Sequence, residues 1–343
     1  MRCTRALIRR LNPLALCALL ACGRPAPPPQ TAAPVTRLHG MCFIARDPAT
    51  AIQPVRSQDW LRLLVKLELG RDAIVAVRDC TGRIIQERRD ASCRQSEPNE
   101  AATPVAIRQA SVVERTLDAD HRLLWVITHR FADGDGFGPL ALAQRSSDGL
   151  DVLALGSLRM HTERVKLELW RVSGEAIVMA SGESCRASSA ASGGENQPAA
   201  NGGEFKDCRR AVRLFVHRKG ALVEAPILDA SGRCMQPSPF DLDSRAQQPL
   251  AAGLKRTFEL TTAIGHDPRQ IVIEEHLVVR DGDPNLPLAA AREVQRVEAT
   301  RFVRVQAGRL YSQQRPLWSQ VLPKLVTPNN REQSGAQRAM NLP

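Results

Sequence analysis

The sequence has few aromatic residues and few lysines. Aromatic side chains make up 4% of its 343 residues, and Tyr311 is the only tyrosine. The four tryptophans are scattered along the chain, so they do not predict an aromatic platform that stacks on sugars. Six lysines stand beside a large excess of arginine in a chain of net charge +11, and acidic residues are interleaved with these basic ones throughout. Because no basic stripe results, we do not expect nucleic-acid binding.

Catalytic and metal-binding motifs are also missing. The chain contains no H-x-x-x-H, G-x-S-x-G or S-x-x-K pattern, no phosphate-binding glycine loop and no paired C-x-x-C. We therefore expect no catalysis, no cofactor and no metal. One weak alternative stays open, a calcium site that Asp133 and Asp135 would share with Asp281 and Asp283. An EF-hand loop is excluded there, because Phe137 and Gln144 occupy the ligand positions.

The N-terminus has the features of an export signal. Four arginines precede an apolar run over 11–21, which is too short to span a bilayer as a helix. The sequence Leu19-Leu20-Ala21-Cys22 follows, and it resembles the lipobox of bacterial lipoproteins. The resemblance covers residues 1–22 only. It implies cleavage before Cys22 and acylation of that cysteine, and Gly23 in place of aspartate implies the outer rather than the inner membrane.

Two alternatives to lipidation at Cys22 stay open. The segment 1–21 can instead be an ordinary signal peptide that is cut elsewhere, which would leave a soluble secreted protein. Cys17 is a weaker lipidation candidate, because bulky Leu16 precedes it and the apolar run continues beyond it.

Six cysteines remain in the exported chain after the signal and Cys22 are set aside. An even number in an exported protein predicts up to three disulfides. Sequence alone allows fifteen pairings, and we favour Cys80–Cys93, Cys185–Cys208 and Cys42–Cys234.

The chain divides by composition into five segments. The signal peptide, 1–21, precedes a Pro/Ala-rich tether at 22–37, which we expect to be extended. Two β domains follow at 38–156 and 157–312, the second with a disordered loop at 187–204. The last segment is a polar tail at 313–343, whose apolar patch Leu317–Leu325 is expected to pack Trp318 against the body.

Alternating apolar residues predict an all-β or β-dominated fold. The clearest runs are Val65–Leu69, Leu123–Phe131, Val165–Leu169 and Val212–Val216. Two proline-led segments, Pro139–Gln144 and Pro287–Val294, are the only expected starts of short helices.

Three ordered sequence blocks recur at an offset of about 150 residues, which suggests an internal duplication into two similar antiparallel domains. Asp79-x-x-Gly82-Arg83 matches Asp229-x-x-Gly232-Arg233, and both read as hairpin turns. The other matches are RLLWVITH with RQIVIEEH, and DGD with a following PLA segment.

The repeat places His129 and His276 in equivalent positions, which makes them the candidate ligand site. His129 lies on an apolar face of its run, which favours a buried, hydrogen-bonded histidine. We expect a lipid-anchored envelope protein that binds or scaffolds a protein, glycan or small ligand at the membrane surface.

Two other functions stay open. An envelope enzyme would use His129 or His276 with a carboxylate. It predicts that the histidines line an open cleft, whereas the binding function predicts that they are buried. A structural or assembly lipoprotein of the outer membrane predicts an exposed apolar patch or a free sheet edge.

Overall fold

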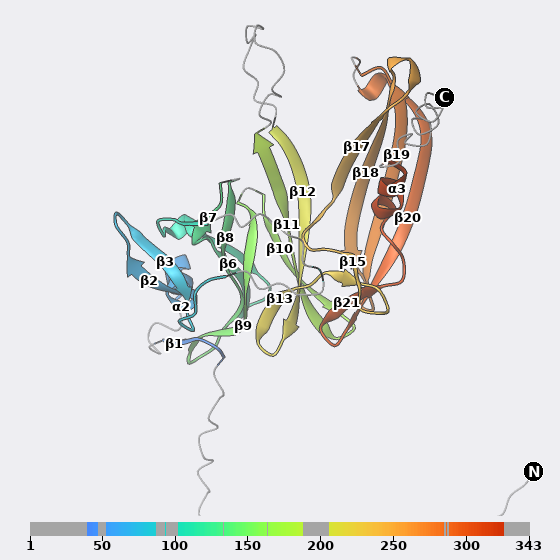
Figure 1. Cartoon of the computed structure of the whole chain (residues 1–343). Helices are drawn as coiled ribbons and strands as arrows, with labels where there is room; N and C mark the ends of the chain where they lie inside the picture. Colours follow the sequence, from blue (N-terminus) through green and yellow to red (C-terminus); the bar gives the residue numbers. More distant parts are fainter. Residues whose placement is uncertain are drawn as a thin grey trace, which may run out of the picture. The chain divides into compact units, whose positions relative to one another are not determined.

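The chain folds into a structure dominated by β-strands, which confirms the expected fold class (Figure 1). This computed structural model describes residues 40–46, 53–86, 93, 102–132, 134–162, 164–187, 206–284, 286 and 288–325. The signal peptide, the tether, Cys22 and most of the loop 187–204 therefore lie outside the described residues.

The largest sheet has 12 strands, and its main path runs β10-β11-β12-β13-β9-β8-β6-β5. These strands are β5 (Val112–Thr116), β6 (His121–Val126), β8 (Asp135–Arg145), β9 (Gly149–His161), β10 (Lys166–Val172), β11 (Glu175–Ala187), β12 (Lys206–Arg218) and β13 (Ala221–Glu224). Four short strands pair beside this path: β1 (Phe43–Ala45), β4 (Thr103–Pro104), β7 (His129–Arg130) and β16 (Phe240–Asp241). The one parallel contact along the path joins β13 to β9.

The second sheet has seven strands in the order β15-β14-β21-β20-β19-β18-β17. They are β14 (Ile227–Leu228), β15 (Cys234–Gln236), β17 (Asp243–Pro249), β18 (Lys255–His266), β19 (Ile271–Gly282), β20 (Arg292–Gln306) and β21 (Arg309–Ser312). From β17 to β21 the strands follow one another antiparallel in chain order.

A third sheet is the hairpin of β2 (Val65–Leu69) and β3 (Ile74–Asp79), which lies next to α2 (Ser57–Leu64) in Figure 1. The sequence patterns considered above did not predict α2. Its helical spacing buries Trp60, Leu61, Leu63 and Leu64, and the Asp59 carboxylate accepts a hydrogen bond of 2.9 Å from the Arg56 amide at its start.

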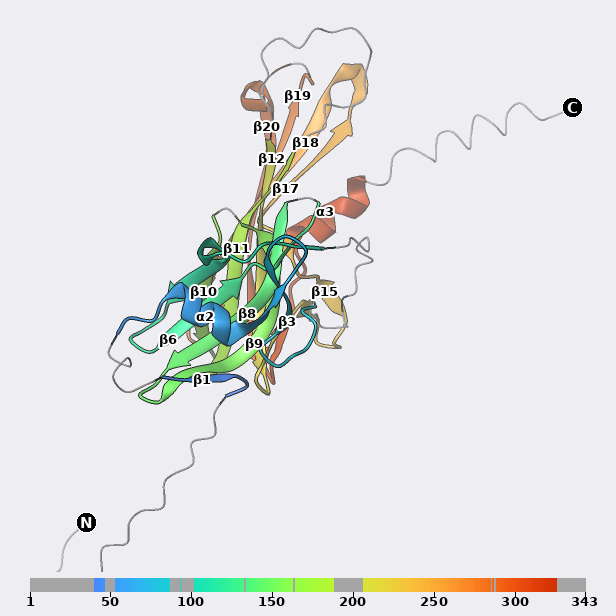
Figure 2. The ribbon, with the colours of Figure 1, turned by 90° about the vertical axis from the view of Figure 1, so that its left-hand side faces the viewer.

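The second helix, α3 (Leu317–Leu325), coincides with the apolar patch that the sequence showed in the tail. Trp318 packs there against a cluster that contains Leu260 and Leu277, as predicted. Figure 2 shows α3 projecting to one side of the strands of the seven-stranded sheet.

The two larger sheets share a hydrophobic core. Its members include Trp170 and Val212 from the 12-stranded sheet, and Ile273 and Val303 from the seven-stranded sheet. The chain crosses from one sheet to the other between β16 and β17, where Leu242 donates a 2.7 Å hydrogen bond to the Arg210 carbonyl. Burial of this shared apolar surface is the main force that holds the sheets together.

Most predicted strands are confirmed, but neither expected helix forms: the first segment is a strand, and the second contains only a 3₁₀ turn. Val65–Leu69 is a strand with the predicted bounds, and Val212–Val216 lies within β12. Pro139–Gln144 lies inside β8, because its alternating leucines and alanines are buried on the two faces of a central strand. Only a 3₁₀ turn, Leu288–Ala290, forms in the second segment before β20 begins.

The structure does not show the internal duplication. The expected domain boundary at 156/157 falls inside β9, and the 12-stranded sheet takes strands from both expected domains. RLLWVITH lies in β6 and β7, whereas RQIVIEEH lies in β19 of the other sheet. Sequence blocks that match therefore occupy unlike elements.

The two Asp-x-x-Gly-Arg blocks do form the same turn, as predicted. Oδ1 of Asp79, and likewise Oδ1 of Asp229, accepts hydrogen bonds from the backbone and hydroxyl two residues later and from the backbone four residues later. Gly82 and Gly232 have φ of 83° and 80°, the left-handed conformation that favours glycine. Local turn chemistry thus explains this repeat.

Two of the three favoured disulfides are wrong. Cys42 is bonded to Cys80, and Cys93 is bonded to Cys234. The prediction of Cys80–Cys93 assumed that neighbours in sequence close local loops, whereas the fold brings the start of β1 to the end of β3. The third pairing stays a prediction; the backbones of Cys185 and Cys208 lie directly opposite each other in β11 and β12.

Candidate functional site

A groove of about 610 Å³ lies between the two larger sheets. One wall comes from β10, β11 and β12, and the other from β18 and β19. Met179, Leu242 and Ile264 line it and also belong to, or pack against, the core that the sheets share. The groove therefore has an apolar floor that continues the core.

Strand alternation explains why the groove opens beyond this core. Lys166, Glu168 and Trp170 occupy alternate positions of β10 and so share one face of the strand. Trp170 is 4% exposed and stacks on His266 with ring centroids 4.9 Å apart. Toward the start of the strand the same face becomes charged. Charged side chains do not fill the space between the sheets as apolar ones do, because burial of an unpaired charge is costly.

Most charges of the groove already have partners. Nη1 of Arg164 lies 3.0 and 2.9 Å from the two carboxylate oxygens of Glu183. Arg210 is hydrogen-bonded through two nitrogens to Asp243, and this bond raises the pKa of Arg210. Trp170 donates a 2.8 Å hydrogen bond from Nε1 to Glu168.

Lys166 differs from these groups. It is exposed, and within the described part of the chain it makes no hydrogen bond or ion pair. Its ammonium group offers three hydrogen-bond donors at the wall of the groove, which Ser181, its register partner, and Thr262 also line. The groove thus combines a free cation, hydroxyl groups and an apolar floor.

His276 lines this groove from β19. Its Nδ1 lies 3.5 Å from Oε1 of Glu298, its register partner on the neighbouring strand β20. Their side chains are 45% and 63% exposed. Glu275, the sequence neighbour, is buried and bonded to Arg301, because successive strand residues point to opposite faces.

His129, the other predicted site residue, is buried in β7 with 9% exposure. Its Nδ1 shares a 2.8 Å hydrogen bond with the Thr128 hydroxyl, and burial lowers the pKa of His129. The two histidines lie in different sheets, and no hydrogen bond, ion pair or ring contact joins them within the described ranges. One histidine therefore lines an open groove and the other is a buried, hydrogen-bonded residue.

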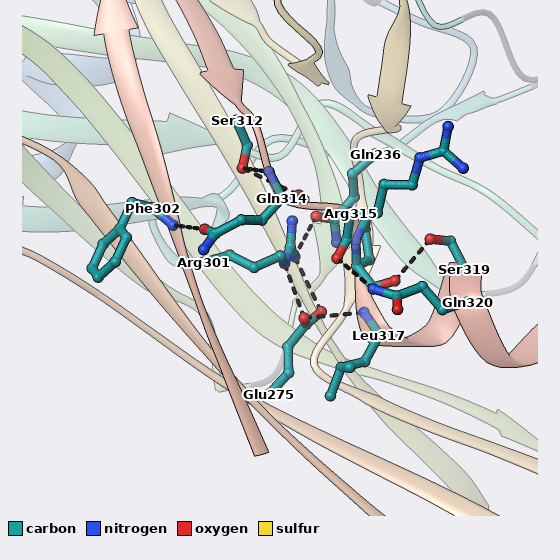
Figure 3. A network of polar contacts seen from close by, with 11 residues as sticks. Gln236, Glu275, Arg301, Phe302, Ser312, Gln314, Arg315, Leu317, Ser319 and Gln320 are labelled. Carbon is teal, nitrogen blue, oxygen red and sulfur yellow. Dashed lines mark hydrogen bonds and ion pairs between the residues drawn. The ribbon is translucent and has the colours of Figure 1, made fainter. Parts of the chain in front are cut away.

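A buried ion pair that was not predicted from the sequence joins β19, which lines the groove, to β20 (Figure 3). Arg301 and Glu275 have side-chain exposures of 1% and 2%. Nε and Nη2 of Arg301 donate hydrogen bonds of 2.9 and 3.1 Å to the two oxygens of Glu275. Burial lowers the pKa of Arg301, and the attraction to Glu275 opposes this shift.

Two more segments join the same pair. Nη2 of Arg301 also donates to Oε1 of Gln236 in β15 at 2.8 Å, and the Leu317 amide at the start of α3 donates to Glu275 at 3.1 Å (Figure 3). The network therefore fixes α3 and β15 to the centre of the seven-stranded sheet. A signal was present in the sequence, because Glu275 follows the alternation of Ile271, Ile273 and Leu277.

Two of the four carboxylates that were considered for calcium, Asp135 and Asp281, are paired with arginine. Asp135 lies 3.2 Å from Arg159, and Asp281 is 2.7 Å from Arg256, while Asp133 lies outside the described residues. In the portion of the chain that the structure describes, no group of three His, Cys, Asp or Glu residues could hold a metal.

Comparisons with protein-family models, with curated proteins and with solved structures found no match for this chain. Among the described residues, no helix is long and apolar enough to span a membrane.

Proposed function

We propose that this chain is a lipid-anchored protein of the bacterial cell envelope that binds a small amphipathic anion in the groove between its sheets. The observation that carries the ligand class is the free Lys166 ammonium beside a floor of Met179, Leu242 and Ile264. Ligand sites are commonly concave, apolar and equipped with a few polar groups that orient the ligand. The anionic head of such a ligand would bind the Lys166 ammonium, and its apolar body would pack on the floor of the groove.

The location rests on residues 1–22, whose basic start, apolar run and Cys22 resemble a lipoprotein signal. Several acyl chains on one cysteine would hold the protein on a membrane, since each buried methylene contributes about 0.8 kcal/mol. By the family rule for the residue after the cysteine, Gly23 favours the outer membrane. Mass spectrometry of the mature N-terminal peptide tests the lipid, and a Cys22→Ser variant that still fractionates entirely with membranes would contradict it.

Laurate, a carboxylate with an apolar chain, is a suitable probe for the groove. Titration calorimetry should show binding to the wild-type protein, and Lys166→Gln should weaken it about fivefold, the effect of one exposed ion pair of about 1 kcal/mol. Lys255→Gln is the matched control, because Lys255 bonds Gln247 on β17 and does not line the groove. Equal loss of affinity in both variants, or no binding at all, would refute the proposed ligand class.

An envelope enzyme is the second candidate, because the His276–Glu298 pair lies at the groove. A histidine that contacts a carboxylate can act as a general base. Hydrolysis of p-nitrophenyl laurate that disappears in both His276→Gln and Glu298→Gln would support this function. Hydrolysis that persists in both variants, or no hydrolysis by the wild type, would leave binding as the function.

A further inference from the structure

Large aliphatic side chains are exposed together on the β2–β3 hairpin and the residues after it. The exposed fractions are 42% for Leu67, 89% for Leu69, 51% for Ile74 and 63% for Ile84. Contiguous exposed apolar surface on a soluble protein commonly marks a binding surface.

The hairpin exposes these residues because it continues an apolar face past the edge of the core. Leu69 and Ile74 face each other next to the turn, and Ala76, on the same face of β3 as Ile74, is buried in the core beneath α2. At the edge of β3 the Ile107 amide donates a 2.8 Å hydrogen bond to the Ile74 carbonyl, but the side chains of Leu69 and Ile74 stay exposed. The tip of the hairpin, residues 69–74, is therefore an apolar end whose side chains are largely open to solvent in the described part of the chain.

Basic side chains lie at both ends of the hairpin. Arg71 is exposed in the turn, and Lys66 and Arg78 are exposed opposite each other near its base. Arg78 lies 3.8 Å from Glu68, and Asp72 is the other exposed carboxylate. Long basic side chains extend to the water while their stems cover apolar surface, and they are attracted to anionic lipid headgroups. The charge pattern thus fits a lipid surface better than a purely apolar protein groove.

The position of the hairpin in the chain also favours the membrane. The Cys42–Cys80 disulfide fastens the end of β3 to the point where the chain leaves the predicted tether. Between Cys22 and Gly40 lie residues that, if extended at about 3.1 Å each, reach roughly 55 Å. The lipid anchor would therefore keep the hairpin within reach of the bilayer.

We infer that the tip of the β2–β3 hairpin inserts into the surface of the membrane that holds the anchor. Leu69 and Ile74 enter the boundary between headgroups and acyl chains, and the basic side chains contact the headgroups. This second contact restricts how the body turns on its tether. The inference rests on the lipid anchor proposed above.

Hydrogen exchange of the lipidated protein tests this contact. In vesicles of phosphatidylethanolamine and phosphatidylglycerol, amides of residues 69–74 should exchange at least about tenfold more slowly than in the unlipidated Cys22→Ser chain in buffer. A variant with Leu69→Glu and Ile74→Glu should lose this protection while it stays vesicle-bound through its lipid. Leu286→Glu is the matched control, because Leu286 is 58% exposed away from the hairpin.

The outcomes separate the hairpin from the anchor. Equal exchange of residues 69–74 with and without vesicles would overturn the inference. A second overturning result would be that the hairpin crosslinks to a partner protein in cells and that its amides are protected only when this protein is present. If Cys22 carries no lipid, only the proposed anchor is refuted. Binding of the hairpin to membranes is then measured by sedimentation of the Cys22→Ser chain with vesicles, and Leu69→Glu with Ile74→Glu should reduce the bound fraction about tenfold.

Discussion

Glu275→Leu should be among the most destabilising single substitutions in the seven-stranded sheet. It would leave the guanidinium of Arg301, which is 1% exposed, without its counter-ion in the protein interior. Breaking a buried ion pair by removal of one partner costs about 3–5 kcal/mol. The Leu317 amide would also lose its acceptor, a further cost of about 1–3 kcal/mol for a buried donor.

A double substitution separates the charge effect from the packing effect. Glu275→Leu with Arg301→Met removes both charges and fills the space with apolar atoms, which is often close to neutral for a buried pair. The remaining cost is the unpaired Leu317 amide, about 1–3 kcal/mol. The double variant should therefore be more stable than Glu275→Leu alone by at least about 2 kcal/mol.

Urea unfolding followed by tryptophan fluorescence measures these differences, since Trp318 packs on the same sheet. The matched control is Glu293→Gln in the Glu293–Arg296 pair, whose side chains are 37% and 58% exposed and whose loss should cost no more than about 1 kcal/mol. A loss below 1 kcal/mol for Glu275→Leu would refute the reasoning. So would a double variant as unstable as the two single variants added together.

Three further predictions concern the 12-stranded sheet and the Cys42–Cys80 disulfide. Burial lowers the pKa of His129, so the stability that neutral His129 contributes is present above about pH 6.5 and is lost as the pH falls below that. Between pH 7.5 and 5.5 the urea midpoint should therefore fall less in His129→Gln than in wild type, and an equal fall would contradict this. Replacing Cys42 and Cys80 by serine opens a loop of 38 residues and should cost about 4 kcal/mol in the same assay, whereas unchanged stability would argue against the bond. Gly156→Ala should cost about 1–3 kcal/mol, because its Cβ would collide with the Leu222 carbonyl where β13 meets β9, and a neutral result would place these strands farther apart.

The sequence by itself determined what depends on neighbouring residues. The alternation at Val65–Leu69 gave a strand with the observed bounds, and the Asp-x-x-Gly-Arg blocks gave two equal turns, because the hydrogen bonds involved span only a few residues. The apolar patch at Leu317–Leu325 has the bounds of α3, although the sequence did not predict that it is helical. The cysteines that flank the loop 187–204 gave opposed positions on adjacent strands.

The tertiary structure alone decided which distant segments meet. Cys42 lies beside Cys80, and Glu275 bonds Arg301 rather than the neighbouring His276, because sheet register sets these contacts and periodicity does not encode it. The groove exists for the same reason: β10 and β18 are distant in sequence and come together only in the fold, where Trp170 stacks on His266 and both strands line the groove. Packing of two sheets, not any motif, placed Lys166 at an opening above an apolar floor.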